Sequence, residues 1–421
     1  MKRKIALFLS LAMMLAIILP VATAEGFNPK EEITLNFPTI WVGTDSKAKV
    51  FGEMVDEFNK EYAGKVKIVI EEQTDYQAYR DKIRTMIGTG NPPDLFTEDT
   101  LKLEALAASG KLMDFSPYFE EGDWANVFSE GSLSEATVDG QIIAIPYETA
   151  GFAIYYNEEL LNKVGYDEFP KTYDEMFELA EKLKAEDIIA FPLMTGENAW
   201  TSMLWYSNIV IAIGGPEVYK HGLDDPAFVK AAEVLKKMFD YTSSDAVGAG
   251  AAVVNGHFLN FGAAIYTNGP WFIPRFAKEG INDLGEKVRF ALPPSYDGGE
   301  GSYGGMANTI QAYLCAAKQE DPEKAQAVAE FYKFITAPER VYKLAESSGS
   351  MFTIKIDPNP NDPALKQELS KAMAEAPYMV KHFNDSMPVA VANGFPAALD
   401  SLILGEVDAE GFVELLKENL D

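Results

Sequence analysis

Residues 33–70 read ITLNFPTIWVGTDSKAKVFGEMVDEFNKEYAGKVKIVI, and this stretch decides the fold. It begins with the period-two alternation of a β-strand at 33–37, and apolar residues then recur at helical spacing over 50–62. A second strand-like run occupies 65–70, and the alternation of strands and helices continues to residue 108. Successive strand–helix units of this kind predict an α/β fold built on mainly parallel sheets that helices flank.

Turn and capping signals extend this reading to the rest of the chain. Asp139-Gly140 favours a tight hairpin, because such a turn requires positive φ. Thr172 and Glu175 form an expected capping box, and Asp225 and Asp321 are expected N-caps that each precede a proline in the first helical turn. Helices dominate the second half, with strands expected at 151–156, 263–266, 288–292 and 309–314.

The composition excludes several classes of protein. The 421 residues include 64 Asp+Glu against 36 Lys+Arg, a formal net charge of −28, and 47% of them are hydrophobic. A chain with this much apolar material can build a large core, so disorder throughout the chain is excluded. The negative charge repels nucleic-acid phosphates and anionic lipid headgroups, and we expect neither as a partner.

Residues that would carry catalysis or hold a metal are scarce. The one cysteine, Cys315, lies in the apolar run 310–316, cannot form an intrachain disulfide and is interpreted as a buried small side chain. The three histidines, His221, His257 and His382, are far apart in the sequence, which does not fit a zinc site. No phosphate-binding loop or hydrolase nucleophile motif occurs, so we predict no catalytic residue and no cofactor.

One segment partly matches a calcium loop. Asp357, Asn359, Asn361 and Glu368 occupy positions 1, 3, 5 and 12 of such a loop, but position 6 is Asp362 instead of glycine. The prolines between them would also stiffen a loop that must wrap an ion. An extended segment followed by a helix that Asp362 caps is the simpler interpretation, with calcium as the alternative.

The first 24 residues are typical of a secretory signal peptide. Three basic residues at 2–4 precede an apolar stretch at 5–19, and Ala22-Thr23-Ala24 matches a cleavage site. The apolar stretch is shorter than the about 20 residues that span a bilayer, and no cysteine follows it that could carry a lipid. We therefore expect an exported protein, periplasmic or extracellular, that is not lipid-anchored through a cysteine.

Two tryptophans lie where a ligand would be expected. Trp41 ends the first predicted strand, where an open parallel sheet places its ligand crevice. Trp271 follows the turn Asn268-Gly269-Pro270, just after another predicted strand. A flat indole ring suits the CH-rich face of a sugar, although tryptophans also fill protein cores.

Seven short segments carry a further signal, in this order along the chain: 33–41, 79–82, 88–96, 107–112, 140–160, 170–175 and 268–271. The fullest are Gly140–Tyr147 with Tyr155–Leu160, and Asn268–Trp271. Together they resemble bacterial extracellular solute-binding proteins of the sugar class, the maltose-binding-protein-like group that supplies ABC importers. Tyr173 stands where that family usually has tryptophan.

The resemblance implies a two-lobe, periplasmic-binding-protein-like fold of type II, with ligand held in the cleft between the lobes. It implies an N-terminal lobe at 25–148 plus 307–335, a C-terminal lobe at 152–302 plus 337–421, and hinges near 149–151, 303–306 and 336. Carried over position by position, the ligand-binding residues are Trp41, Asp45, Glu98, Asp99, Tyr147, Glu148, Trp200, Trp271, Tyr303 and Gly304.

The function that the resemblance implies is capture of a sugar or oligosaccharide by an exported, monomeric binding protein. That protein closes around its ligand and delivers it to the membrane permease of an ABC importer. An anionic solute is disfavoured because the predicted site has no lysine or arginine cluster, and ferric iron because the site lacks a tyrosine–histidine set. A polyamine would suit Asp45, Glu98, Asp99 and Glu148, and a secreted carbohydrate-active enzyme is a further alternative, since carboxylates are plentiful in the chain.

Overall fold

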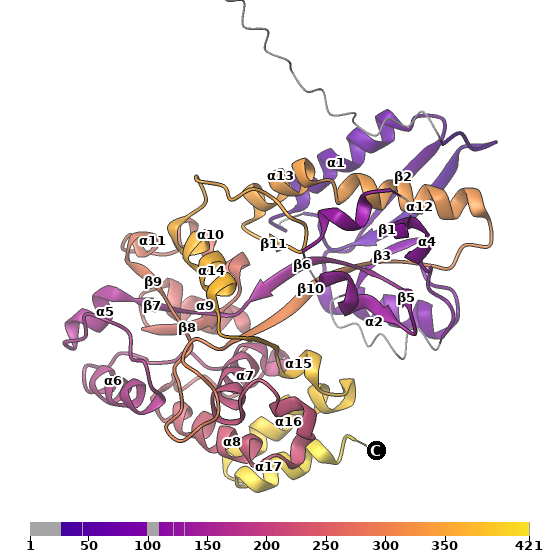
Figure 1. The fold of residues 1–421 in the computed structure, drawn as a ribbon. Helices are drawn as coiled ribbons and strands as arrows, with labels where there is room; N and C mark the ends of the chain where they lie inside the picture. The colour runs from indigo at the N-terminus through magenta and orange to yellow at the C-terminus, as the bar shows by residue number, and fades with distance from the viewer. Residues whose placement is uncertain (1–26, 44, 99–108, 121, 130, 421) are drawn as a thin grey trace, which may run out of the picture.

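The computed structural model describes residues 27–43, 45–98, 109–120, 122–129 and 131–420. The predicted signal peptide, the expected helix at 101–108 and the candidate ligand residue Asp99 lie outside the described residues. The described chain forms two α/β lobes, and Figure 1 shows strands β6 (Ile145–Gly151) and β10 (Met306–Ala316) running between them. No helix in the described part of the chain is long and apolar enough to cross a membrane.

The first lobe combines the N-terminal segment with helices from much later in the chain (Figure 1). Its elements are β1 (Ile33–Thr39), α1 (Ala48–Glu61), β2 (Val66–Glu72), α2 (Tyr76–Gly88), β3 (Leu95–Glu98), α4 (Ser116–Glu120), β4 (Thr137–Val138), β5 (Gln141–Ile142), α12 (Pro322–Ile335), α13 (Pro338–Ser348) and β11 (Met351–Phe352). β1 and β2 pair in parallel, and β4 and β5 form the predicted hairpin. Phe37 of β1 meets Phe51 of α1 and Phe331 of α12 edge to face, with ring centroids 5.6 and 6.1 Å apart, so these rings join the two helices to the sheet.

The second lobe is built mainly from helices. Its elements are β7 (Ala153–Asn157), α5 (Glu158–Lys163), α6 (Tyr173–Ala185), α7 (Trp200–Gly214), α8 (Pro226–Met238), α9 (Ala251–Leu259), β8 (Ile265–Asn268), α10 (Ile273–Lys278), α11 (Leu284–Lys287), β9 (Val288–Ala291), α14 (Ala364–Glu375), β12 (Met379–Lys381), α15 (Phe383–Ser386), α16 (Val389–Leu404) and α17 (Ala409–Lys417). Every residue of α7 from Thr201 to Ile213 is buried, so α7 is the central helix of this lobe. The capping box of Thr172 and Glu175 and the N-cap of Asp225 are both formed as predicted.

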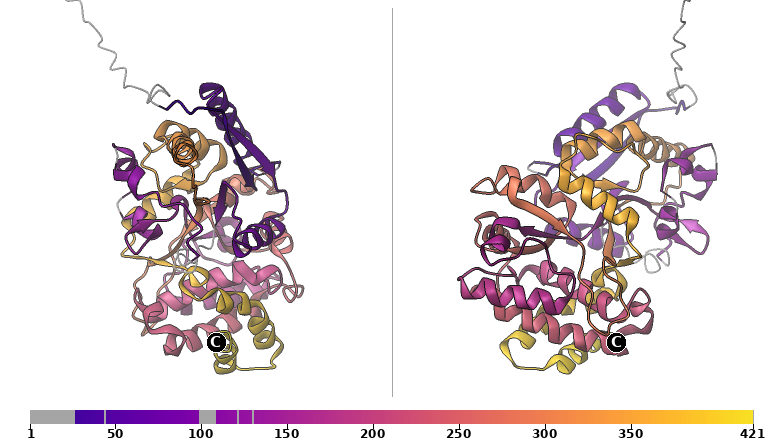
Figure 2. Two further views of the ribbon diagram at one scale, coloured as in Figure 1. Left: turned by 90° about the vertical axis from the view of Figure 1, so that its right-hand side faces the viewer. Right: turned by 60° about the vertical axis from the view of Figure 1, so that its left-hand side comes forward.

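β6 and β10 form a two-stranded antiparallel connection that runs between the lobes (Figure 1). They pair antiparallel, from Leu314 opposite Ile145 at one end to Asn308 opposite Gly151 at the other. Beyond that end the ladder continues, because the Phe152 amide donates to the Ala307 carbonyl at 3.0 Å. Figure 2 shows the same two-lobed arrangement from two further sides.

The prediction of mainly parallel sheets is wrong for the described strands. β1 pairs in parallel with β2 and β10 with β12, whereas β3, β6, β7, β8, β9 and β11 all pair antiparallel with their partners. The reason is that strands cross between the lobes in opposite directions. β10 returns from the second lobe and enters the first beside β3 and β6, both of which run the other way.

The predicted third hinge near Thr336 is also misplaced. Thr336 is buried in the first lobe, where its hydroxyl accepts a hydrogen bond from the Trp124 indole at 2.8 Å. The following helix, α13, places Val341 and Leu344 in the first-lobe core, and β11 then pairs with β6. α13 is amphipathic and its apolar face finds its partners in this lobe, and the chain stays on the lobe as far as Ile356, which packs against the same core.

Candidate ligand-binding cleft

Two neighbouring cavities lie between the lobes and meet at Trp271 and Gln311. The first, called here the Trp41 cavity, has a volume of about 660 Å³ and is walled by Ile40, Trp41, Asp45, Ser46, Lys47, Tyr79, Thr97, Glu98, Glu148, Trp271, Pro274, Arg275, Lys278, Glu279, Gln311, Ala312, Ser347 and Ser348. The second, the Trp200 cavity, has about 580 Å³ and is walled by Asp75, Arg80, Phe152, Glu197, Asn198, Trp200, Met203, Leu204, Trp271, Thr309, Gln311, His382, Asn384 and Asp385. Both lobes contribute walls to each cavity. Because the two cavities also share Trp271 and Gln311, they form one cleft between the lobes.

The cleft brings together six of the ten predicted ligand-binding residues. Five of them line the Trp41 cavity: Trp41, Asp45, Glu98, Glu148 and Trp271. Trp200 lines the Trp200 cavity, and Trp271 lines both. The aromatic and acidic side chains expected to share one site are therefore neighbours in space, although they come from segments more than two hundred residues apart.

Tyr147 lies elsewhere, in the core of the first lobe. Its side chain is fully buried, its hydroxyl donates to the Ile335 carbonyl at 3.0 Å, and its ring lies 5.8 Å from that of Trp41. The neighbouring residue Glu148 faces the cleft instead, because successive side chains of a strand point to opposite sides. Tyr147 therefore supports Trp41 from behind and does not line the cleft.

Tyr303 and Gly304 also lie outside the cleft. They line a separate cavity with Tyr156, Phe169 and residues of α14. The loop that carries them folds against α7, where the amides of Glu300 and Gly301 donate to the carbonyls of Ile213 and Ala212. That packing holds the loop on the second lobe and keeps Tyr303 away from Trp271.

The indole of Trp271 occupies the centre of the cleft. It is partly exposed, with its ring centroid 6.5 Å from that of Trp200 and 6.3 Å from that of Phe152. Gly269 makes room for the ring, because a Cβ at this position would lie 2.2 Å from two ring carbons. Trp41, by contrast, is only 3% exposed and meets Phe51 edge to face at 5.0 Å, so only a small part of its ring is available to a ligand.

Sequence reasoning missed the basic side chains of the cleft. Lys47 is buried beside two predicted ligand residues, with its ammonium 3.5 Å from a Glu148 carboxylate oxygen and 3.7 Å from Asp45. Arg275 and Lys278 come from α10 on the opposite wall. The statement that the site has no lysine or arginine cluster is therefore wrong, and the position of Lys47 two residues after Asp45 was the signal that could have revealed it.

The Arg275 guanidinium is already engaged by a carboxylate. Its Nε and Nη2 donate to the two oxygens of Glu279 at 2.7 and 2.6 Å. These hydrogen bonds are the main cause that lowers the pKa of Glu279 below its ordinary value. A bidentate pair of this kind holds Arg275 in place on the wall of the cleft.

A polar network lies in the Trp200 cavity beside the crossing strands. The Asp385 carboxylate lies 3.3 Å from Nε2 of His382 and accepts a hydrogen bond from the Thr309 hydroxyl at 2.5 Å. Thr149 of β6 in turn donates to the Thr309 carbonyl at 3.1 Å. Burial alone would raise the pKa of Asp385, but the charge of His382 and the hydrogen bonds from His382 and Thr309 bring it below its ordinary value.

The lowered pKa of Asp385 predicts a loss of stability in acid. A carboxyl group whose pKa is lower in the folded than in the unfolded chain stabilises the fold above its unfolded pKa of about 3.9, and this contribution disappears as the pH falls through the folded value. We expect the free energy of unfolding, measured with urea, to decrease as the pH is lowered below about 4. In the Asp385→Asn variant, the change of this free energy per pH unit should be smaller by up to about 1.4 kcal/mol. An unchanged acid slope in the variant would contradict this role.

The segment that partly matches a calcium loop is engaged in other contacts. The Asp362 carboxylate accepts a hydrogen bond from the Lys366 ammonium at 3.1 Å, and the Asn359 side chain bonds to Glu346 and to the Asn361 amide. No group of three or more His, Cys, Asp or Glu residues that could hold a metal ion occurs within the described ranges. Cys315 is fully buried in β10, as interpreted from the sequence, and burial raises the pKa of its thiol.

The fold and the cleft together define a two-lobed solute-binding protein. The family model described as bacterial extracellular solute-binding protein matches residues 53–395, and the chain belongs to this family. It is similar to the diacetylchitobiose binding protein DasA of Streptomyces coelicolor, 28% identical over 379 residues that cover 83% of this chain and 79% of that protein.

Two further comparisons bear on the fold and on the ligand. The sn-glycerol-3-phosphate-binding periplasmic protein UgpB of Brucella abortus is 25% identical over 328 residues, which cover 70% of each chain. A solved chitin oligosaccharide binding protein superposes with a TM-score of 0.83 at 21% identity, over 92% of this chain and 98% of that one. The two-lobe fold of type II expected from the sequence is thereby confirmed.

Proposed function

We propose that this protein is the exported substrate-binding component of an ABC importer and that it captures a sugar or oligosaccharide in the cleft. The observation that carries the proposal is the partly exposed Trp271 indole between the two cavities, opposite the carboxylates of Asp45, Glu98 and Glu148. An aromatic ring face packs against the CH groups of a sugar, while carboxylates accept hydrogen bonds from its hydroxyl groups. The relatives named for diacetylchitobiose and chitin oligosaccharide support this class of ligand.

Binding is coupled to closure of the lobes in this proposal. A sugar that contacts Asp45 and Glu98 on one lobe and Trp271 on the other binds the closed arrangement more tightly, and this difference shifts the equilibrium towards closure. Two of the hinges are the crossings at 149–152 and 303–306. The third is the segment 355–363, which replaces the hinge predicted near residue 336. The closed form, a monomer, then docks on a membrane permease and releases the sugar, and no bond of the ligand is broken.

A phosphorylated polyol is the second candidate. Lys47, Arg275 and Lys278 line the Trp41 cavity, and a relative is named for sn-glycerol 3-phosphate. Against this candidate, Lys47 lies beside Glu148 and Asp45, and Arg275 is bound to Glu279. A phosphate would therefore have to compete with carboxylates for two of the three cations, Lys47 and Arg275.

A thermal-shift screen distinguishes the candidates. A ligand of the native state at one hundred times its Kd stabilises the protein by about 2.7 kcal/mol and raises its melting temperature. We expect a rise with at least one neutral oligosaccharide from a panel of diacetylchitobiose, maltotriose and xylobiose, and none with glycerol 3-phosphate or spermidine. If the melting temperature rises only with glycerol 3-phosphate or only with spermidine, that solute and not a sugar is the ligand. If it rises with no neutral sugar in the panel, this result counts against the proposal.

A further inference from the structure

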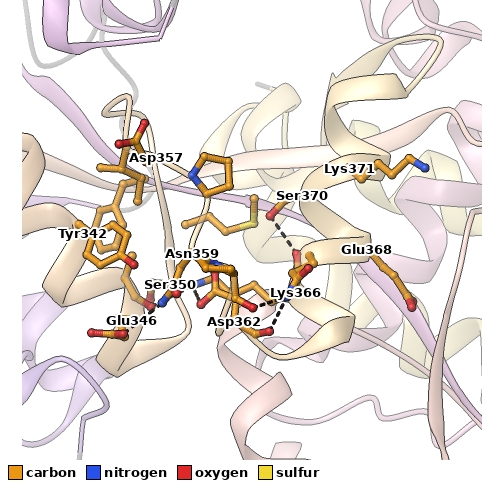
Figure 3. Close-up of a pocket in the computed structure, with 17 residues that line it drawn as sticks. Tyr342, Glu346, Ser350, Asp357, Asn359, Asp362, Lys366, Glu368, Ser370 and Lys371 are labelled. Atoms are coloured by element: carbon orange, nitrogen blue, oxygen red, sulfur yellow. Dashed lines mark hydrogen bonds and ion pairs between the residues drawn. The ribbon is translucent and has the colours of Figure 1, made fainter.

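A further cavity between the lobes lies outside the cleft. It has a volume of about 750 Å³ and is bounded by α13, β11, the segment 355–363 and α14 (Figure 3). We call it the α13–α14 cavity, and its lining shares no residue with either cavity of the cleft. α13 packs in the core of the first lobe and α14 places Leu365 and Leu369 in that of the second, so an occupant would touch both lobes.

The walls of this cavity combine apolar side chains with polar and charged ones. Tyr342, Met351, Phe352 and Ile356 are the large apolar residues among them. Ser350 also lines the cavity and is fully buried, and its Oγ has no hydrogen-bond partner among the described residues. A buried hydroxyl without a partner is costly, and a ligand group that hydrogen-bonds to it would remove that cost.

The charges around the cavity disfavour an anion. The Lys366 ammonium is buried in the wall, where it donates to the Ala345 carbonyl at 2.9 Å and to Asp362 at 3.1 Å, so its charge is already matched. Four carboxylates line the cavity against two ammonium groups: Glu346, Asp357, Asp362 and Glu368 against Lys366 and Lys371. An incoming negative charge would therefore meet net repulsion.

We propose that the α13–α14 cavity is a second ligand site, for an uncharged and largely apolar molecule that carries one hydrogen-bonding group. The apolar body fills the space between Tyr342 and Phe352, and the polar group bonds to Ser350. The site lies close to the cleft along the chain, because Phe352 is opposite Glu148 in the pairing of β11 with β6, and Ser347 and Ser348 at the end of α13 line the Trp41 cavity. The proposal does not depend on which solute the cleft takes.

Titration of the purified protein with 2-naphthol, followed by ligand-observed NMR, tests the proposal. Ser350→Ala should weaken binding about fivefold, the loss typical of one neutral hydrogen bond, without lowering the melting temperature. Ser370→Trp should abolish binding, because Ser370 lines the cavity from an exposed position of α14 where the larger ring can fill it. Ala374→Trp is the matched control, since Ala374 is exposed on the same helix but lines none of these cavities.

Two further arms keep the outcome decisive. Trp271→Ala should leave 2-naphthol binding unchanged, whereas a loss in that variant would show that the probe enters the cleft and would overturn the assignment. The anion 2-naphthoate should bind at least tenfold more weakly than 2-naphthol at pH 7. Equal binding of the two probes, or unchanged binding of 2-naphthol to Ser370→Trp, would overturn the proposal.

Discussion

Replacing Trp271 with alanine is expected to weaken sugar binding at least tenfold, which corresponds to about 1.4 kcal/mol. The indole lines both cavities of the cleft and is partly exposed, so a sugar that spans them loses its largest apolar contact. Trp271→Phe keeps an aromatic face and should lose less. Isothermal titration calorimetry with a sugar identified in the thermal-shift screen measures all three proteins.

The control for this experiment is Tyr303→Ala. Tyr303 was also predicted as a ligand residue, but it lines a separate cavity, so its replacement should leave the sugar affinity unchanged. Wild-type affinity in a folded Trp271→Ala protein would remove this ring from the site. A loss in Tyr303→Ala as large as that in Trp271→Ala would show that ligand binding reorganises the loop at 293–305.

Replacing Lys47 with methionine is expected to destabilise the fold by about 3 kcal/mol, the lower end of the cost of breaking a buried ion pair. Lys47 and Glu148 are 7% and 3% exposed, with 3.5 Å between ammonium and carboxylate, so the variant leaves a buried carboxylate without this cation. Urea unfolding at pH 7 measures the change.

The double variant Lys47→Met with Glu148→Gln separates the ion pair from simple packing. With the charge of Glu148 also removed, we expect the protein to regain much of the lost stability, because no uncompensated charge stays buried. If the free energy of unfolding of Lys47→Met lies within about 0.5 kcal/mol of the wild-type value, as for an ordinary surface substitution, the ion pair does not stabilise the fold. If the double variant is no more stable than Lys47→Met, the loss comes from packing and not from charge.

Local structure was predictable wherever local physical chemistry decides it. The first strand–helix–strand unit, the Asp139-Gly140 hairpin and the capping box at Thr172 depend on residues close in sequence, and all three are present. Strand direction and lobe membership depend on distant contacts. α13 belongs to the first lobe because Val341 and Leu344 meet that lobe's core, and nothing in the residues near 336 specifies this.

The sequence predicted those residues of the candidate site that could be recognised by residue type and by their place at a strand end or crossing. Trp41, Glu98, Glu148 and Trp271 fall at strand ends or crossings, and the structure brings them into one cleft. Tyr147 could not be separated from its neighbour Glu148 by motif alone, because the distinction depends on which face of β6 each residue occupies. Of the basic residues of the cleft, Lys47 could have been foreseen from its place two residues after Asp45, whereas Arg275 could not, since it reaches the cleft only through the packing of the two lobes.

Small-angle X-ray scattering with and without a saturating oligosaccharide tests the central claim most directly. If the two lobes close around a sugar in the cleft, the radius of gyration must fall when the sugar is added and must return to its starting value when the sugar is dialysed away. The Trp271→Ala protein at the same sugar concentration should show a smaller change. A sugar that binds by calorimetry but leaves the radius of gyration unchanged would contradict the account.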